Sequence, residues 1–99
     1  MADAPEHLAL DEDEQALLAG LRAGAEGAFE TLVRTTSARL LAVARRIVGS
    51  EEDARDVLQE AYTSAFKALP RFEGQAKLST WLHRIVVNTA LMRLRTRKR

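Results

Sequence analysis

Apolar residues recur every three or four positions through most of this chain, which is the spacing of one face of an α-helix. No stretch shows the strict alternation of a half-buried β-strand. The first predicted helix follows the acidic run at residues 11–14, carries Leu17, Leu18 and Leu21, and ends at Gly24. With three further helices described below, the pattern predicts an all-α protein, a compact bundle of about four helices.

A long second helix is predicted after a turn over residues 24–27. Gly49 closes this helix, since glycine readily adopts the left-handed conformation that ends helices. Its apolar stripe is weakened where Thr35, Thr36 and Ser37 follow one another. The stripe consists of Phe29, Leu32, Val33, Leu40, Val43, Ala44 and Ile47.

The third helix is predicted to begin at a capping box, in which Ser50 accepts a hydrogen bond from the backbone of Asp53 and the Asp53 side chain reaches back. Pro70 cannot continue this helix, because proline lacks the backbone N–H. Its core stripe consists of Ala54, Val57, Leu58, Ala61, Tyr62, Ala65 and Leu69.

After a loop over residues 70–77, Ser79 or Thr80 can cap a fourth helix. This helix runs into the basic end of the chain. The side chains predicted to face inward are Leu82, Ile85, Val86 and Thr89.

A chain of 99 residues, 46% of them hydrophobic, is sized for a single domain. We expect a loose N-terminal tail over residues 1–10, the helical domain over residues 11–95 and the start of a basic linker over residues 96–99. There is no cysteine, and His7 and His83 are too few and too far apart for zinc, so we expect no metal and no cofactor. No leader or membrane-spanning stretch is recognisable, which favours a cytoplasmic protein without a membrane partner.

Charge is strongly uneven along the chain, although the net charge is only +1. Residues 1–30 hold eight acidic side chains against one basic side chain, Arg22, whereas residues 74–99 hold seven basic side chains and no acidic one. Such asymmetry is typical of nucleic-acid contact, but it also fits a soluble helical domain with one acidic and one basic tail.

One exposed face of the third helix is predicted to carry clustered polar groups. Asp56 and Glu60 stand four residues apart with Gln59 between them, and this like-charge pair disfavours an isolated helix by a few tenths of a kcal/mol. The face could meet only water, or its acceptors could bind arginines of a partner protein. Thr63 and Lys67 continue the same face.

Three blocks of this sequence, in this order, resemble region 2 of bacterial RNA polymerase sigma factors of the extracytoplasmic-function group. They are DVLQEAY from Asp56, LPRFEG from Leu69 and STWLHRIVVNTA from Ser79. The likeness covers nearly everything from about Asp13 to Arg95. It implies that Asp56, Gln59 and Glu60, with Asp53, bind the clamp coiled coil of the β′ subunit in core RNA polymerase.

The loop between the third and fourth helices allows two interpretations. The Phe72 ring either anchors the loop to the core, which is the commoner fate of a lone aromatic residue, or helps form a pocket for an unstacked base. The resemblance favours the second, because the family loop captures a flipped base of the non-template strand in the minus-10 promoter element. The loop residues assigned to DNA are Arg71, Phe72, Glu73, Gly74, Gln75 and Lys77.

On the fourth helix, one face distinct from the inward stripe carries Trp81, Arg84, Asn88, Leu91 and Arg95. Arginines can neutralise phosphates, and an asparagine can hydrogen-bond a base edge. Trp81 borders the core stripe, so core packing and DNA stacking both remain open for it. The resemblance implies minus-10 recognition and strand opening by this face; the residues assigned to DNA are Ser79, Thr80, Trp81, Arg84, Asn88, Arg93 and Arg95.

The sequence departs from the family pattern at Leu78 and His83, which stand where the family often has aromatic residues. The leading hypothesis is a promoter-recognition domain without enzymatic activity, since no catalytic or phosphate-cradling motif is present. The alternatives are a helix-turn-helix regulator that reads duplex DNA and a protein-interaction bundle. The resemblance also implies an anti-sigma partner, and it leads us to expect a longer protein, because no sequence here matches the family's region 4.

Overall fold

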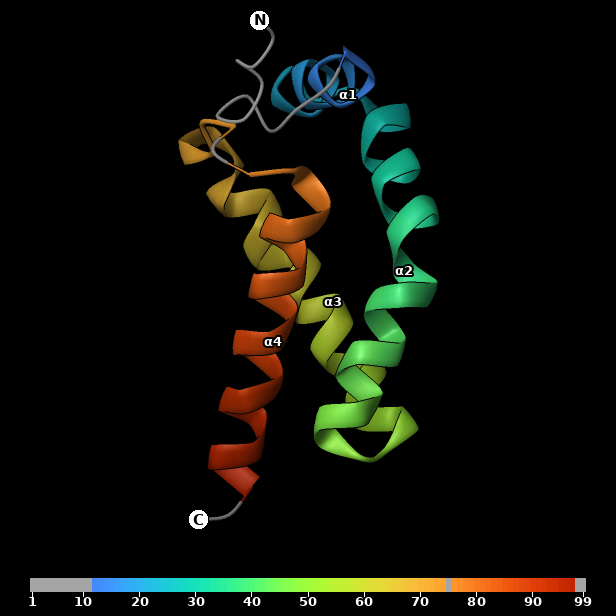
Figure 1. Cartoon of the computed structure of the whole chain (residues 1–99), viewed down its shortest axis with the longest axis vertical. Coiled ribbons are helices and arrows are strands. Elements are labelled where there is room, and N and C mark those ends of the chain that lie inside the picture. The colour runs from blue at the N-terminus through green and yellow to red at the C-terminus, as the bar shows by residue number, and fades with distance from the viewer. Residues whose placement is uncertain (1–11, 75, 98–99) are drawn as a thin grey trace, which may run out of the picture.

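The computed structural model describes residues 12–74 and 76–97, and these form four α-helices and one short 3-10 helix. The helices are α1 (Glu12–Arg22), α2 (Glu26–Val48), α3 (Glu51–Ala68) and α4 (Leu78–Arg97), with the 3-10 helix η2 (Leu69–Arg71) after α3. The predicted all-α bundle is confirmed (Figure 1). The predicted tail at residues 1–10, the loop residue Gln75 and the last two residues lie outside the described residues.

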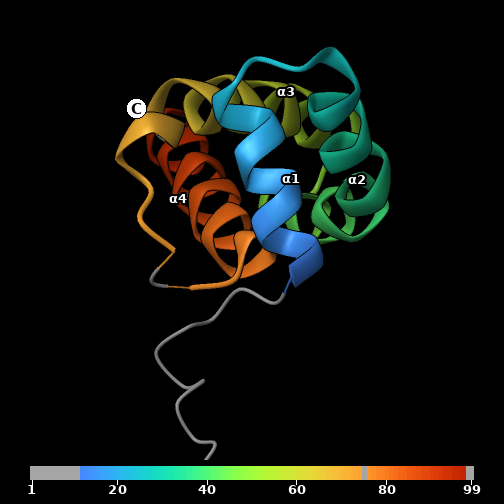
Figure 2. The same ribbon diagram turned by 90° about the horizontal axis from the view of Figure 1, so that it is seen from above.

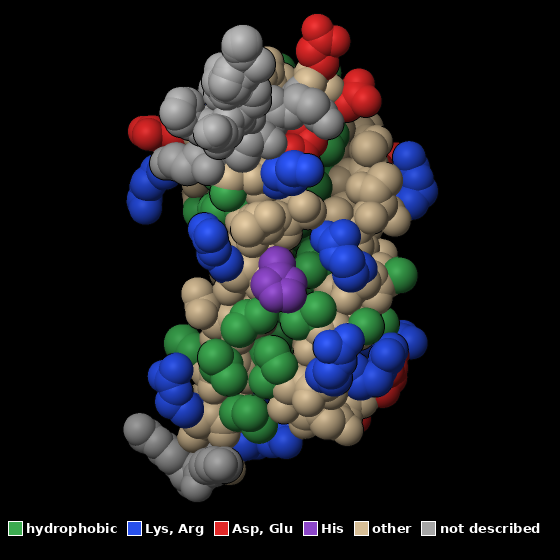
Figure 3. Space-filling view, in the orientation of Figure 1, with side chains coloured by type: hydrophobic (Ala, Val, Ile, Leu, Met, Phe, Trp, Pro, Cys, Tyr) green, Lys and Arg blue, Asp and Glu red, His purple; other side chains and the backbone are tan. Residues whose placement is uncertain are grey.

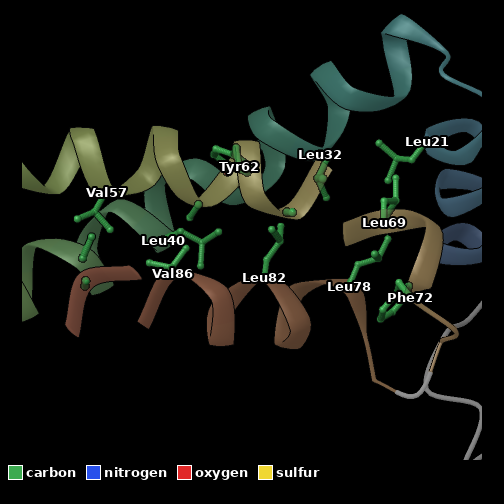
Figure 4. Close-up of a cluster of buried hydrophobic side chains, with 14 of the residues drawn as sticks. Leu21, Leu32, Leu40, Val57, Tyr62, Leu69, Phe72, Leu78, Leu82 and Val86 are labelled. Carbon is green, nitrogen blue, oxygen red and sulfur yellow. The ribbon is translucent and has the colours of Figure 1, made fainter. Parts of the chain in front are cut away.

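Helices α2, α3 and α4 pack against one another, and α1 lies across one end of the three. Seen from above, α1 covers that end of the bundle, and α3 lies behind α2 and α4 (Figure 2). The core runs along the axis of the bundle, and its largest fully buried side chains are Leu40, Val57, Leu78, Leu82 and Val86 (Figure 4).

The buried stripe of α2 follows a four-residue repeat and includes a threonine, which the apolar pattern did not predict. Thr36 is 6% exposed, and its hydroxyl donates to the Leu32 carbonyl over 2.6 Å. The same hydroxyl oxygen lies 2.6 Å from the Tyr62 hydroxyl on α3. A threonine can be buried here because its one polar atom is satisfied twice. The buried residues of α2 are Leu32, Thr36, Leu40, Ala44 and Val48.

Capping explains where α2 ends and α3 begins. Gly49 adopts the left-handed conformation (φ 81°), and its N–H donates to the Arg45 carbonyl, as predicted for a glycine cap. Ser50 accepts from the backbone N–H of Asp53 over 3.2 Å, which confirms one half of the predicted capping box. The other half is wrong, because the Asp53 side chain is paired with arginines of α4 instead. The turn before α2 is also shorter than predicted, since Glu26 already begins the helix.

Helix α4 begins at Leu78, one or two residues before the predicted capping residues. Leu78 is 1% exposed and therefore belongs to the core rather than to a surface where an aromatic residue would stack on DNA. The inward stripe is completed by Ala90, which is fully buried, whereas Thr89 is only half-buried. The helix continues through Thr96 and Arg97, so the predicted start of a linker at residue 96 is still helical.

Candidate functional site

The three polar residues predicted to bind core polymerase lie together on the open side of α3. Asp56, Gln59 and Glu60 are all exposed, and they are one helical turn or one residue apart. The Thr63 hydroxyl donates to the Gln59 carbonyl over 3.1 Å, so Thr63 continues this face without competing for the Gln59 side chain. We call Asp56, Gln59 and Glu60 the acidic face. Both carboxylates are exposed, although that of Asp56 also lies near Arg93, and exposed carboxylates can bind arginine or lysine of a partner.

Asp53 does not belong to the open part of this face. Its side chain is only 26% exposed, and it forms ion pairs with Arg97 and with Arg93, whose Nη1 lies 3.3 Å from Asp53 Oδ1. Three residues before Asp56, the helix has turned toward α4, and the carboxylate points to that helix. The sequence-based assignment grouped Asp53 with the acidic face, whereas the structure gives it a contact between helices.

Arg93 likewise lies apart from the residues with which it was grouped. Its guanidinium is half-buried between α3 and α4, with Nη1 3.8 Å from Asp56 Oδ2. Arg93 and Arg95 are two positions apart and therefore point to nearly opposite sides of α4. The structure thus separates Arg93 from the exposed arginines Arg84 and Arg95.

Arg97 joins three helices at this end of the molecule. Besides pairing with Asp53 at the start of α3, its Nη1 and Nη2 donate to the Val48 carbonyl at the end of α2, over 3.4 and 3.2 Å. A cation is well placed at the C-terminal end of a helix, where the last carbonyls have no helical partner. We call Asp53, Arg93 and Arg97 the interhelix ion-pair cluster.

Two further ion pairs, both between exposed side chains, lie at the turn between α2 and α3. Arg45 Nε donates to Glu51 Oε1 over 2.6 Å, and Arg55 Nε donates to Glu51 Oε2 over 3.2 Å. The hydrogen bond from Arg45 is the main reason why the pKa of the Glu51 carboxyl lies below its usual value. Arg45 and Arg55 are therefore occupied within the protein.

The loop after η2 is anchored through Phe72. Its side chain is 4% exposed, and its ring centroid lies 4.7 Å from that of Trp81 on α4, with the rings tilted by 39°. Of the two interpretations of Phe72, the structure shows the anchoring one, and a buried ring offers no open face to a base. Trp81 is half-buried, so it both packs on the core and keeps an exposed edge.

The polar residues of the loop remain accessible around this anchor. Arg71, Glu73 and Lys77 are exposed, and Gly74 has a positive φ of 81°, where a side chain is strained. Gln75 was also assigned to DNA, but it lies outside the described residues. The loop therefore presents polar groups on a backbone turn held in place by the Phe72–Trp81 contact.

The outer face of α4 carries the remaining candidates. Arg84, Asn88 and Arg95 are exposed, as the sequence pattern predicted, and Leu91 on the same face is 40% exposed. Thr80 is exposed and Ser79 half-buried in the first turn of the helix. No acidic residue follows Glu73 in the sequence, so this face combines cations, an amide and apolar surface without carboxylates.

One apolar groove was not predicted. Phe66 of α3 is 54% exposed and meets the Phe29 ring edge-on at a centroid distance of 5.7 Å. Together with Tyr62 and Val33, these rings line a groove of about 650 Å³ that reaches Gln59 of the acidic face. Phe66 directly follows Ala65 of the core stripe of α3 but does not belong to that stripe. This large apolar residue outside the stripe was the sequence signal that could have predicted the groove.

Within the described ranges, no three histidine, aspartate or glutamate side chains come together as they would around a metal ion. None of the described helices is both long enough and apolar enough to cross a membrane.

Comparison with known proteins identifies the family. A family model described as Sigma-70 region 2 matches residues 32–99. An RNA polymerase sigma-H factor of Pseudomonas aeruginosa is 38% identical over 88 residues, which are 89% of this chain and 46% of that protein. The ECF RNA polymerase sigma factor SigM of Mycobacterium tuberculosis (strain H37Rv) is 42% identical over 88 residues, which are 89% of this chain and 45% of that protein.

A solved structure shows the same fold. It is an NMR structure of an engineered region 2 of sigmaE in complex with GTAAAA, with a TM-score of 0.79 and 37% sequence identity. The match covers 91% of this chain and 96% of that chain. The chain thus spans less than half the length of the curated relatives it matches but nearly all of a separately studied region 2. The protein therefore belongs to the Sigma-70 region 2 family and resembles its ECF members in sequence, which confirms the family resemblance of the three sequence blocks.

Proposed function

We propose that this domain docks on core RNA polymerase through the acidic face of α3 and engages single-stranded minus-10 promoter DNA through the loop and the outer face of α4. The observation that carries the proposal is the separation of charge. Asp56 and Glu60 are exposed on α3, whereas Arg84 and Arg95 are exposed on α4, a helix without any acidic residue. The two sets of residues lie on different helices, so we expect that both faces can be occupied at the same time.

The polymerase contact is assigned to Asp56, Gln59 and Glu60, and its partner to the β′ clamp coiled coil. Two carboxylates flanking an amide can take charge-assisted hydrogen bonds from arginines of a partner helix. Asp53 supports this face indirectly, since its carboxylate is engaged with Arg93 and Arg97.

The DNA contact is assigned to the loop and to α4. Arg84 and Arg95 neutralise phosphates, and Asn88 hydrogen-bonds a base edge. A base that leaves the stack is held by the exposed groups of the loop around Gly74, while the Phe72–Trp81 contact keeps the loop in place. Binding energy alone opens the strands, since holding the extruded base offsets an unstacking cost of a few kcal/mol. No catalytic step is required.

This division of roles is tested by fluorescence anisotropy with three probes: a single-stranded minus-10 oligonucleotide, its duplex and a purified clamp coiled coil. We expect binding to the single strand and to the coiled coil. Arg84→Gln and Asn88→Ala should weaken only the former, and Lys67→Gln on α3 should leave DNA binding unchanged.

Preference for the duplex would instead support a helix-turn-helix regulator, and loss of all DNA affinity even in the polymerase-bound form would contradict the proposal. An anti-sigma partner stays a prediction of the family resemblance. A protein that displaces the coiled coil from the acidic face in the same assay would support this prediction of an anti-sigma partner.

A further inference from the structure

Helix α2 carries a row of exposed arginines to which the sequence patterns assigned no role. Arg39 and Arg46 are both exposed and seven residues apart, which places them on one side of the helix about 10 Å from each other. Thr35 and Ala42 lie on the same side, at steps of three and four residues. We call Arg39 and Arg46 the α2 arginine pair.

Among the described residues, these two arginines have no acidic partner. In the described part of the chain, neither Arg39 nor Arg46 forms an ion pair, whereas the neighbouring Arg45 binds Glu51. The acids of α2, Glu26 and Glu30, lie in its first two turns, away from the pair. An exposed cation pair without local carboxylates attracts an anionic partner.

The α2 arginine pair adjoins residues already assigned to DNA. Arg39 lines a surface depression of about 260 Å³ together with Ser79, Thr80 and His83 from the first turns of α4. Ser79 and Thr80 are hydroxyl residues that can hydrogen-bond a phosphate. Arg39 is therefore connected to the first turns of α4 through a shared depression, and Arg46 lies two helical turns further along α2.

Figure 3 shows the side of the molecule on which α2 and α4 lie in front. Lys and Arg side chains surround a patch of hydrophobic side chains there, with a histidine above the patch, and the acidic side chains gather mainly at the end where α1 lies. Cations around apolar surface suit a single strand, which offers both phosphates and unstacked bases. A duplex would bury its bases and leave the apolar patch unused.

We infer that α2 is a second nucleic-acid surface, on which Arg39 and then Arg46 bind phosphates of a single DNA strand that continues from the face of α4 across the shared depression. The inference rests on the proposed function, because it extends the strand assigned to α4. It adds two phosphate contacts to the proposed function. It also gives the path of the bound strand, which runs from α4 toward the C-terminal end of α2. On this path a strand that leaves α4 reaches Arg39 first and Arg46 only when it is longer.

The test measures the salt dependence of single-strand binding by the domain as it stands, using fluorescence anisotropy with oligonucleotides of about 6 and about 12 nucleotides, the range of sites on comparable single-strand binders. The variants are Arg39→Gln, Arg46→Gln and both together. Arg34→Gln is the matched control, because Arg34 is exposed on the same helix but points to a different side. Thermal unfolding by circular dichroism checks that each variant folds.

For the longer oligonucleotide, each single change should lower the slope of log affinity against log salt by about 0.7, and the double change by about 1.4. Arg34→Gln should leave the slope unchanged, and Arg46→Gln should affect the shorter oligonucleotide less than the longer one. An unchanged slope in the double variant, while Arg84→Gln still lowers it, would overturn this inference and leave the proposed function standing. Absence of single-strand binding by the unaltered protein, both alone and bound to polymerase, would overturn both.

Discussion

Helices α3 and α4 are neighbours of similar length, but their surfaces are organised differently. In α3 the buried residues lie on one side and the exposed residues on the other, with Asp56 and Glu60 facing outward. In α4, Leu82 and Val86 are buried, yet Leu91 and Met92 are 40% and 59% exposed. The exposed carboxylates Asp56 and Glu60 of α3 suit a basic protein partner, whereas the outer face of α4, which has cations and apolar side chains but no carboxylate, suits nucleic acid.

The two helices also use part of their charge on each other. Arg93 and Arg97 of α4 meet Asp53 at the start of α3, so these arginines hold the bundle together while Arg84 and Arg95 stay free. Charge counted along the sequence therefore overstates what either helix offers to a partner. The following experiments, from the largest expected effect to the smallest, separate the structural from the partner-binding residues of α3 and α4.

The largest expected effect is on the free energy of unfolding, and it distinguishes a buried leucine of α4 from an exposed one. Leu82→Ala should lower the free energy of unfolding by about 2–5 kcal/mol, because it removes a fully buried side chain and leaves a cavity. Leu91→Ala, at a position that is 40% exposed, should change it by about 0.5 kcal/mol or less. Urea denaturation followed by circular dichroism measures both, and equal losses would mean that α4 has no distinct exposed apolar face.

The next effect concerns the acidic face of α3. Asp56→Ala together with Glu60→Ala should weaken binding to the clamp coiled coil at least about 100-fold, because two charged contacts are lost. Helicity should persist, since both side chains are exposed. Glu12→Ala with Asp13→Ala on α1 removes the same charge from exposed positions and serves as the control. Retained binding by the α3 variant would refute the assigned face.

A smaller effect is expected in the interhelix ion-pair cluster. Asp53→Asn should lower the free energy of unfolding by about 1–2 kcal/mol, because the half-buried Arg93 and the more exposed Arg97 lose a charged partner. Glu52→Gln removes a charge from an exposed position in the same first turn and should stay within about 0.5 kcal/mol. If both variants unfold alike in urea, the cluster has no structural role and Arg93 becomes available again as a DNA contact.

The smallest effect is the hydroxyl contact between α2 and α3. The Thr36 hydroxyl gives its proton to the Leu32 carbonyl, so the Tyr62 hydroxyl donates to Thr36, and Tyr62→Phe should cost about 1 kcal/mol. Burial raises the pKa of the Tyr62 hydroxyl.

The pH dependence of the Tyr62 contribution follows from its raised pKa. Its stabilisation is complete below the unfolded pKa of about 10 and is lost as the pH rises through the higher folded pKa. As the pH rises above about 10, the native protein should therefore lose more stability than Tyr62→Phe does. Urea midpoints across this range measure the difference, and identical pH profiles would contradict the burial of this hydroxyl.

Much of this architecture follows from the sequence alone. The three-and-four spacing of Ala54, Val57 and Ala61 places α3, and Gly49 and Ser50 mark the turn before it, because helix periodicity and capping act between residues close in the chain. The acidic face could be predicted from the sequence for the same reason, since Asp56, Gln59 and Glu60 lie on one helix. The three sequence blocks supplied the family, which composition and periodicity could not name.

Only the tertiary structure decided which polar and aromatic groups are turned inward. Thr36 is buried because the Tyr62 hydroxyl of α3 hydrogen-bonds with its hydroxyl. Phe72 is buried because Trp81 of α4 packs against its ring. Asp53 forms ion pairs because α4 places its arginines beside this carboxylate. These contacts join residues between 9 and 44 positions apart in the chain, and no local pattern encodes such a meeting. Arg39 lines one depression with Ser79 and Thr80 for the same reason, because α2 packs beside α4.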